Sequence, residues 1–208
     1  MKKNGILIAV VVIVLIAVMI YSLPSGTPDA ATYAAAIEKE RQEKDNFMRT
    51  GDGSPFAGDS GTFAGLQYFP PDLKFKIQAR LEPIQTKEIR VLQTSDGKNQ
   101  SYLPFAHAVF DWQGVENRLL ILEVMDPGPF RGTLFLAFAD GTSANETYGA
   151  GRYLDVKKVA GATRIELDFN KAYNPYCAYA DNFSCPLPPK ENLLTLRIEA
   201  GEKTYWQK

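Results

Sequence analysis

The sequence contains one histidine and two cysteines among 208 residues. A single histidine, His107, excludes zinc sites built from several histidines of one chain, and any serine-histidine catalysis would depend on it alone. Strand alternation places His107 on the same face as Leu103, Phe105 and Val109, which favours a histidine packed in the core over a general base. The net charge is −1 and no cluster of lysines and arginines accompanies the aromatic residues, so no nucleic-acid partner is expected.

Charged residues are also absent from a long apolar run near the N-terminus, residues 5–23. At about 1.5 Å per helical residue, this run nearly spans a hydrocarbon core of roughly 30 Å, so it predicts a transmembrane helix in the lipid bilayer. Lys2 and Lys3 precede the run and predict a cytoplasmic N-terminus with an extracytoplasmic C-terminal domain. A cleaved signal peptide is the alternative. Residues 21–24 lack the small residues that its cleavage site needs, which favours an uncleaved single-pass signal anchor over residues 1–23.

A spacer and a short charged helix are expected over residues 24–50. Residues 30–48 are rich in alanine and charge, and Tyr33 and Ile37 are spaced for one helical face. The middle of the helix is polar on all sides, which favours a solvated stalk; docking of the helix on the following domain is the alternative. Glycine-rich loop composition then marks the start of a β domain predicted for residues 51–208.

Alternation of apolar and polar residues predicts that residues 73–82 form a strand with one buried face and one solvated face. Turns with glycine or proline separate the further strand candidates, and the turn at residues 95–98 suits a hairpin. Many short strands without helical periods between them favour a mainly β fold, either an antiparallel β-sandwich or a partly open barrel. The other expected strands are residues 87–94, 101–112, 118–125, 133–139, 152–156, 163–169, 193–200 and 203–206.

Residues 168–192 contain both cysteines and many aromatic, asparagine and proline residues, but no glycine. The prolines lower the conformational entropy of the unfolded chain, so this long connection is expected to be ordered, and long ordered loops are often functional. The spacing of Cys177 and Cys185 matches no usual zinc pair, so no metal site is predicted. Three states remain open for them: a disulfide worth roughly 2–3 kcal/mol, two free thiols, or a nucleophilic Cys177 whose pKa another group would have to lower.

Residues 140–153 form the second candidate segment. Gly149 and Gly151 bracket an alanine before Arg152, which is a weak phosphate-binding signal; a turn or bulge is favoured because a strand, not a helix, is expected to follow. Glu146 is a candidate ion-pair partner of Arg152, and Asp168 ends the strand that leads into the cysteine segment. Glu146 and Asp168 together would suit acid/base catalysis or an oxygen-ligated cation.

A family resemblance is carried by two long stretches, residues 138–154 and 167–179, together with shorter ones at residues 65–71, 79–80, 185–189 and 200–203. They resemble a prokaryotic family of unknown function, DUF1684. The resemblance runs from about residue 44 to residue 203, so the apolar run and most of the charged helix lie outside it. The family has no established activity, substrate or cofactor, so the resemblance implies none for this chain.

The resemblance adds a set of positions. The family pattern maps onto Glu146, Thr147, Tyr148, Gly149, Gly151, Arg152, Asp168, Asn170, Tyr173, Asn174, Cys177 and Cys185. Many relatives look cytoplasmic and still have both cysteines, which favours free thiols or a packing role over a disulfide. The chain departs from the family in its apolar N-terminal run and in Tyr176, where a second proline is usual.

The first functional hypothesis is a β domain that binds a small polar or anionic ligand through residues 140–153 and 168–192. Arg152 would supply a fork of donors for an anionic group. The hydrogen-bonding side chains of that site would be Tyr148, Asn170, Tyr173 and Asn174.

Two alternatives stand beside it. The domain is an enzyme, for example a hydrolase, with Glu146 or Asp168 as acid/base and Cys177 as nucleophile. Alternatively, both segments have a purely structural role and tie the ends of the sheet together.

Overall fold

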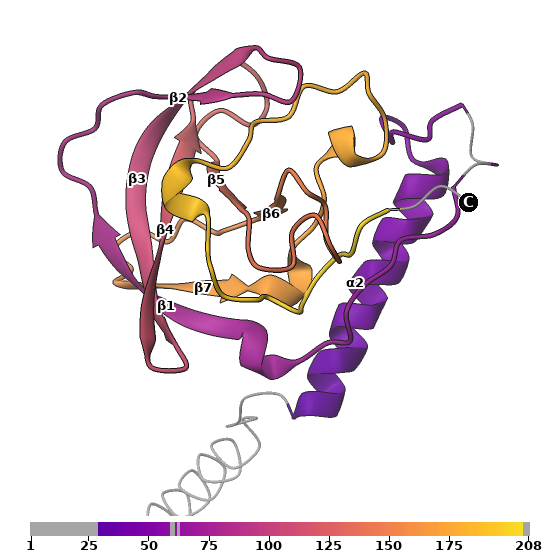
Figure 1. The fold of residues 1–208 in the computed structure, drawn as a ribbon, viewed down its shortest axis with the longest axis horizontal. Coiled ribbons are helices and arrows are strands. Elements are labelled where there is room, and N and C mark those ends of the chain that lie inside the picture. Colours follow the sequence, from indigo (N-terminus) through magenta and orange to yellow (C-terminus); the bar gives the residue numbers. More distant parts are fainter. Residues whose placement is uncertain (1–28, 59–60, 62, 206–208) are drawn as a thin grey trace, which may run out of the picture.

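The computed structural model describes residues 29–58, 61 and 63–205 (Figure 1). The described elements are the helix α2 (Ala30–Thr50) and the strands β1 (Lys76–Pro83), β2 (Arg90–Gln93), β3 (Asn99–Trp112), β4 (Val115–Val124), β5 (Leu134–Phe138), β6 (Arg152–Leu154) and β7 (Arg164–Asp168). Short 3₁₀ helices are η2 (Leu73–Phe75), η3 (Phe169–Lys171), η4 (Tyr176–Ala178) and η5 (Lys190–Asn192). Strands are therefore the main regular secondary structure of the described residues after α2.

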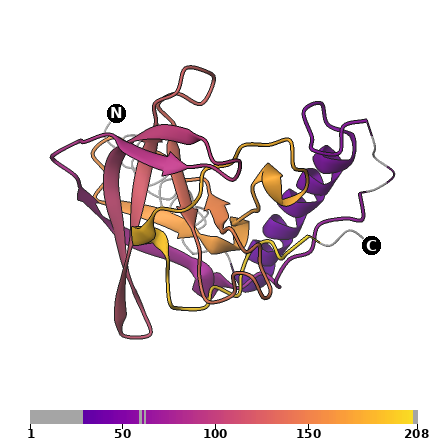
Figure 2. The same cartoon turned by 45° about the horizontal axis from the view of Figure 1, so that its top comes forward.

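The strands form an antiparallel seven-stranded sheet in the order β6-β5-β4-β3-β1-β7, and β2 pairs with β3. The long strands β3 and β4 curve, and the sheet wraps partly around the segments that follow β7 (Figures 1 and 2). The fold is a mainly antiparallel β half-barrel with one α-helix in the described residues, which confirms the expected β class. The hairpin predicted at residues 95–98 joins β2 to β3, and Gly97 has the positive φ, 79°, that its turn requires.

The hydrophobic core lies between the sheet and the segments that follow β7. From the sheet it includes Phe110, Leu119, Ile121, Leu136, Phe138 and Leu167. Phe169 and Ala172 join it from the 168–192 segment, and Ile198 and Ala200 join it from the C-terminal segment. These two segments thus close the open side of the half-barrel with apolar side chains, whose burial stabilises the fold.

The alternation over residues 73–82 predicts the buried face of β1 correctly but not its first residue. Phe75 and Ala79 are buried in the core, and Ile77 and Leu81 pack partly against it. The side chain of Asp72 accepts a hydrogen bond from Lys74 N at 2.9 Å and caps the short helix η2. Because this cap starts a 3₁₀ turn, β1 begins only at Lys76.

Residues 193–200 do not form a strand, so that prediction is wrong. Their alternation does reflect burial, because Ile198 and Ala200 are in the core and Leu194 and Leu196 pack against it. Their carbonyls, however, are used by a loop and a side chain: Gly141 N donates to Leu196 O at 2.8 Å, and Arg152 donates to Ile198 O. The described residues 203–205 of the last predicted strand are also outside any strand.

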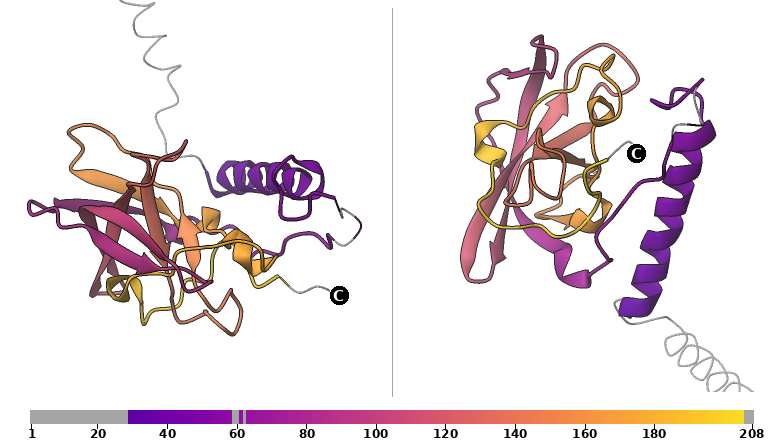
Figure 3. Two further views of the ribbon diagram at one scale, coloured as in Figure 1. Left: turned by 90° about the horizontal axis from the view of Figure 1, so that it is seen from above. Right: turned by 45° about the vertical axis from the view of Figure 1, so that its right-hand side comes forward.

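Helix α2 packs along one side of the half-barrel (Figure 3). Asp29 caps its start by accepting from Thr32 N at 2.8 Å, and the helix ends before Gly51. Tyr33, Ile37 and Met48 are buried, as is the charged Arg41. The solvated-stalk interpretation is therefore wrong: these four side chains form a narrow stripe along which the helix packs against the domain.

The predicted transmembrane helix over residues 5–23 lies outside the described residues. Among the residues that are described, no helix combines the length and the apolar character that a membrane crossing needs. The anchor, the membrane location and the bilayer as a partner therefore stay predictions.

Candidate functional site

Arg152 begins β6, and its side chain is completely buried. Its Nη2 donates to Asp140 Oδ2 at 2.7 Å and to Ile198 O at 3.0 Å. Its Nη1 donates to the carbonyls of Ala200 and Glu202. Burial lowers the pKa of Arg152, and the neighbouring Asp140 opposes this shift. The guanidinium ties the C-terminal segment to the sheet: its two Nη groups bond protein acceptors, and the buried Nε has no hydrogen-bond partner among the described residues.

Gly151 forms the turn that directs Arg152 into the interior. Its φ is +92°, and a Cβ at this position would lie 2.6 Å from Phe138 O and 2.6 Å from Pro188 Cγ. The Gly151 N–H donates to Tyr148 O at 3.1 Å and closes the turn. The motif with two glycines is therefore a tight turn against β5, as the turn interpretation predicts.

Gly151→Ala is expected to destabilise the domain by about 3 kcal/mol, because a clash is added to the cost of a left-handed backbone. Gly161→Ala is the matched control, since Gly161 has a φ of +71° but open space where its Cβ would lie. That control is expected to lose about 1 kcal/mol. Urea unfolding midpoints measure both losses, and equal losses would contradict a role for close packing at Gly151.

The two candidate acid/base carboxylates have different surroundings. Glu146 is partly exposed and pairs with Arg197, so the expected ion pair with Arg152 is wrong. Asp168 is buried, and its Oδ1 accepts from Tyr33 Oη of α2 at 2.7 Å. One carboxylate is thus held at the surface and the other beneath α2, and the structure does not bring them into one acid/base site.

Asn170 and Asn174 are buried and hold neighbouring segments of the chain. Asn170 accepts from Asp72 N at 2.8 Å and donates to Asp72 O at 2.9 Å. Asn174 donates to Glu202 Oε1 at 2.8 Å, and Glu202 also accepts from Lys44 Nζ at 2.8 Å. The predicted site does not include Glu202, whose partners lie far from it in the sequence. Both asparagines thus hold the polypeptide in place.

A cavity of about 610 Å³, which we call the aromatic cavity, is bordered by β5, β6 and the 168–192 segment. A chain of neighbouring rings forms much of its wall. The Tyr102 and Phe135 centroids are 5.1 Å apart, and those of Phe135 and Tyr153 are 4.8 Å apart. Tyr173 continues the chain, with its centroid 6.0 Å from that of Tyr153. The remaining aromatic lining residues are Phe130, Tyr176 and Phe183.

The charged groups that line the aromatic cavity are carboxylates. They are Asp126 and Asp155, and none of the described lining residues is lysine or arginine. Tyr173 donates from its hydroxyl to Asp155 Oδ1 at 2.8 Å. Burial raises the pKa of Tyr173, and the Asp155 charge raises it further, so the phenol stays neutral at physiological pH. The cavity thus combines aromatic faces with negative charge.

Both predicted segments contribute to the aromatic cavity, but mostly through other residues than those predicted. Tyr173 is the predicted ligand-binding residue that lines it, and Tyr153 represents the 140–153 segment. Sequence reasoning did not select Tyr102 or Phe135, because aromatic residues on strands are typical of an ordinary core. The predicted ligand-binding residues outside its lining are Tyr148, Arg152, Asn170 and Asn174, and the catalytic candidates Glu146, Asp168 and Cys177 are outside it as well.

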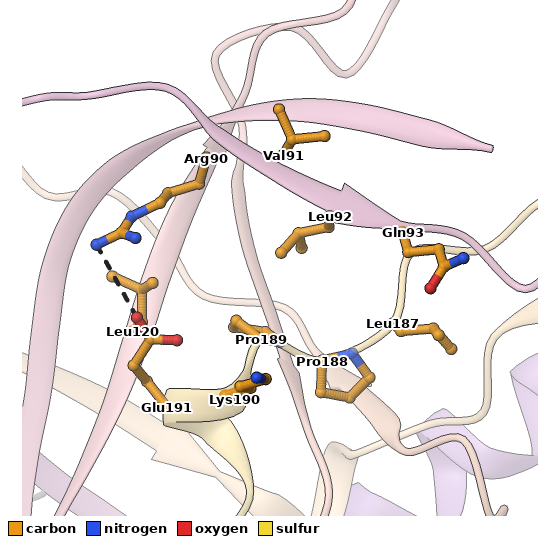
Figure 4. A pocket seen from close by; sticks show the side chains of 10 residues that line it. All are labelled: Arg90, Val91, Leu92, Gln93, Leu120, Leu187, Pro188, Pro189, Lys190 and Glu191. Carbon is orange, nitrogen blue, oxygen red and sulfur yellow. Dashed lines mark ion pairs between the residues drawn. The ribbon is translucent and has the colours of Figure 1, made fainter. Parts of the chain in front are cut away.

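A second cavity, of about 360 Å³, lies between β2 and residues 187–191 (Figure 4). Its charged residues have both signs, and Arg90 Nη2 lies 4.0 Å from Glu191 Oε1. Lys190 is the further charged residue of its lining. Because charges of both signs meet there, this cavity defines a ligand class less clearly than the aromatic cavity does.

Cys177 lies half-buried in η4, and the thiols of Cys177 and Cys185 are both free. Tyr148 Oη lies 3.8 Å from Cys177 Sγ. Hydrogen bonding by the Cys185 side chain, helped by Ser95 and Tyr148, lowers the pKa of Cys177 to about 6. The candidate histidine, His107, is partly buried, and burial lowers its pKa. Within the described residues, no group of three or more His, Cys, Asp or Glu side chains is arranged to hold a metal ion.

The fold and these segments define a β half-barrel closed by an ordered connection without glycine. Residues 61–203 match the family described as "Protein of unknown function (DUF1684)", and the chain belongs to this family. A similar solved structure is the solution NMR structure of the uncharacterized protein from gene locus rrnAC0354 of Haloarcula marismortui. It is 36% identical, with a TM-score of 0.63, over 85% of this chain and 96% of that chain. No functionally curated protein matches the chain.

Proposed function

We propose that the domain binds a small organic cation in the aromatic cavity. The observation that carries this proposal is the combination of a wall of aromatic rings with Asp126 and Asp155, in a lining whose described residues include no lysine or arginine. A cation over the face of a tyrosine or phenylalanine ring gains about 0.5–2 kcal/mol, more when it is desolvated. The volume of about 610 Å³ falls in the range of small-molecule sites.

The proposal keeps the two segments predicted from the sequence but changes the charge of the ligand. A polar or anionic ligand was expected because Arg152 was expected to face it. The Arg152 guanidinium is instead buried and already has Asp140 and three carbonyls as partners. Tyr153, the residue after Arg152, has its ring in the cavity wall. One face of β6 thus supports the fold while the other contributes to ligand binding.

The alternative of a purely structural role fits the buried residues of segments 140–153 and 168–192. Arg152 and Asn174 both bind the C-terminal segment, and Asn170 binds the chain before β1. These contacts hold the cavity wall in place, so a structural role for the buried residues and ligand binding by the exposed rings are compatible. A rigid wall is also what a cation site needs, because aromatic rings that are already ordered lose little entropy on binding.

Choline and its neutral isostere 3,3-dimethylbutan-1-ol test the proposal with the full-length chain, by ligand-observed NMR and isothermal titration. Choline is expected to bind at least about tenfold more tightly than the isostere, because only choline has the charge that the rings and carboxylates attract. The variant with both Asp126→Asn and Asp155→Asn is expected to weaken choline binding by about tenfold, since both carboxylate charges are removed. Asp52→Asn removes an exposed carboxylate outside the cavity and is expected to leave binding unchanged.

Equal affinities for choline and the isostere would show that the rings bind only apolar surface. Binding of acetate in preference to choline would instead support the anionic ligand expected from the sequence. The absence of binding by choline at millimolar concentration would contradict the proposal.

A further inference from the structure

We infer that Cys177 and Cys185 form a site for thiol–disulfide exchange with low-molecular-weight disulfides, with Cys177 as the attacking thiol and Cys185 as the resolving thiol. This inference does not rest on the proposed function, because it concerns the two sulfur atoms and not the occupant of the aromatic cavity. The cation proposal uses neither thiol, since Cys185 lines the aromatic cavity without contributing charge and Cys177 is not part of its lining.

The two cysteines are in contact in the folded chain. The Cys177 N–H donates to Cys185 Sγ at 3.2 Å, so the second sulfur lies against the backbone of the first cysteine. The sequence separates them by residues 178–184, and the fold brings them together because that stretch makes a tight loop that begins in η4. Exchange with an external disulfide followed by internal resolution needs such a neighbouring pair.

The position of Cys185 is held by the end of β2. Ser95 N donates to Cys185 O at 2.8 Å, and Cys185 N donates to Ser95 Oγ at 3.2 Å. Two residues further on, Leu187 N donates to Gln93 O at 2.8 Å. This ladder of bonds keeps the resolving sulfur buried and in place, with 8% of Cys185 exposed.

Cys177 has the opposite environment and is the more accessible thiol. It lies in a single 3₁₀ turn and is partly exposed, so a small disulfide can approach it. Tyr148, Ser95 and Cys185 present donors to its sulfur, and these donors stabilise the thiolate. For Cys185 the pKa shift has the opposite sign: its hydrogen bond to Cys177, together with burial, raises its pKa. The roles of the two thiols follow from this asymmetry.

The reaction balances without any further reactant. The Cys177 proton passes to solvent, and the thiolate attacks one sulfur of an R–S–S–R disulfide, whose S–S bond breaks and releases one RS⁻. The Cys185 thiol then loses its proton to solvent and attacks Cys177 Sγ, which releases the second RS⁻. Both RS⁻ ions take up a proton, so two protein thiols are oxidised to one disulfide while R–S–S–R is reduced to two thiols.

Oxidised glutathione is the probe, applied to the full-length chain in buffers of varied ratio to reduced glutathione. After acid quenching and alkylation, intact-mass measurement is expected to show an internal disulfide in the wild-type chain. Cys185→Ser is expected to stop at a mixed disulfide of glutathione with Cys177. Cys177→Ser, the matched variant, is expected to form a mixed disulfide at least about tenfold more slowly, because the remaining thiol, Cys185, is buried and a disulfide reaches it poorly.

The pH dependence of alkylation at Cys177 gives a second test. Its rate is expected to have a midpoint near the thiol pKa of about 6, whereas an unperturbed thiol has one near about 8.5. The rate at pH 7 discriminates less well. At pH 7 the thiolate fraction of Cys177 is roughly 30-fold larger than that of an unperturbed thiol, but its intrinsic nucleophilicity is about tenfold lower because its pKa is lower, so the two effects largely cancel.

A midpoint near that of a free thiol, or a wild-type chain that stays reduced at every glutathione ratio, would overturn the inference. Equal rates for Cys177→Ser and Cys185→Ser would overturn the assigned roles. If Cys177→Ser does not fold, the wild-type chain quenched at short reaction times decides the matter, because peptide mapping locates the first mixed disulfide on Cys177 or, against the assigned roles, on Cys185. Choline binding is measured independently, so failure of the cation proposal and failure of this one are distinguishable.

Discussion

Arg152→Met is expected to destabilise the domain by about 4–5 kcal/mol, because it leaves a buried carboxylate and three carbonyls without their donor. Asp140 would remain buried with only Thr142 and Ile198 N as partners. Equilibrium urea unfolding, followed by tryptophan fluorescence and circular dichroism, measures the loss. Arg197→Met is the control, since Arg197 is about half exposed and its ion pairs with Glu146 and Glu199 lie at the surface. That control is expected to lose less than about 1 kcal/mol.

The pairing of Arg152 with Asp140 can be separated from the loss of packing. Asp140→Asn removes the charge, and the double variant of Asp140→Asn with Arg152→Met no longer leaves a buried carboxylate without its cation. The loss in the double variant is therefore expected to be at least about 1 kcal/mol smaller than the sum of the two single losses. Arg152→Lys is expected to lose about 2–3 kcal/mol, because an ammonium group keeps the charge but cannot reproduce the fork. Wild-type stability in Arg152→Met would show that the guanidinium is not needed by the fold and is free for a ligand.

The strands were predictable where the alternation of apolar and polar residues and the turn that joins two strands lie close together in the sequence. The hairpin of β2 and β3 depends on Gly97 and on alternation that local residues carry, and the structure has it. Residues 193–200 alternate in the same way but do not form a strand, and Leu193 makes an isolated bridge with Ala139. A period of two reports which face is buried and not what the backbone pairs with. Helix α2 packs against the domain through few buried residues, and hydrophobic periodicity averaged over a mostly polar helix does not reveal them.

The candidate site was predictable as two segments but not as a set of atoms. The position of Arg152 after two glycines is equally compatible with a surface loop and with a buried turn. Its acceptors, at Ile198, Ala200 and Glu202, come from a segment whose path sequence patterns do not fix. Tyr102 contributes to the aromatic cavity from β3, and in the sequence it is indistinguishable from a core residue. Long-range pairing therefore decides which residues line the aromatic cavity.

Asn192 is the second residue whose replacement is expected to have a large effect. Its side chain is completely buried and fills the gap where the ladder between β4 and β5 ends. Its Oδ1 accepts from Leu120 N at 2.6 Å, and its Nδ2 donates to Leu120 O at 2.9 Å and to Ala137 O at 2.7 Å. One side chain thus takes the place of the missing strand-to-strand hydrogen bonds between the two strands.

Asn192→Ala is expected to destabilise the domain by about 3–5 kcal/mol, because three buried backbone groups lose their partner at about 1–3 kcal/mol each. Asn145→Ala removes an exposed asparagine and is the control, with an expected loss of less than about 0.5 kcal/mol. Hydrogen exchange adds a readout specific to the Asn192 side chain, because the Leu120 amide is expected to lose its protection in Asn192→Ala. The Ala108 amide, in the β3–β4 ladder, is expected to keep protection equal to that of global unfolding.

Asn192→Asp distinguishes the donors from the volume of the side chain. The carboxylate still accepts from Leu120 N but places negative charge against the carbonyls of Leu120 and Ala137, so its loss is expected to equal or exceed that of Asn192→Ala. If Asn192→Asp were as stable as the wild type, donation to the two carbonyls would not contribute to stability, and the Asn192 side chain would act through packing alone. Because the same segment continues through Pro188 and Pro189 toward the aromatic cavity, loosening Asn192 is expected to weaken choline binding as well as stability.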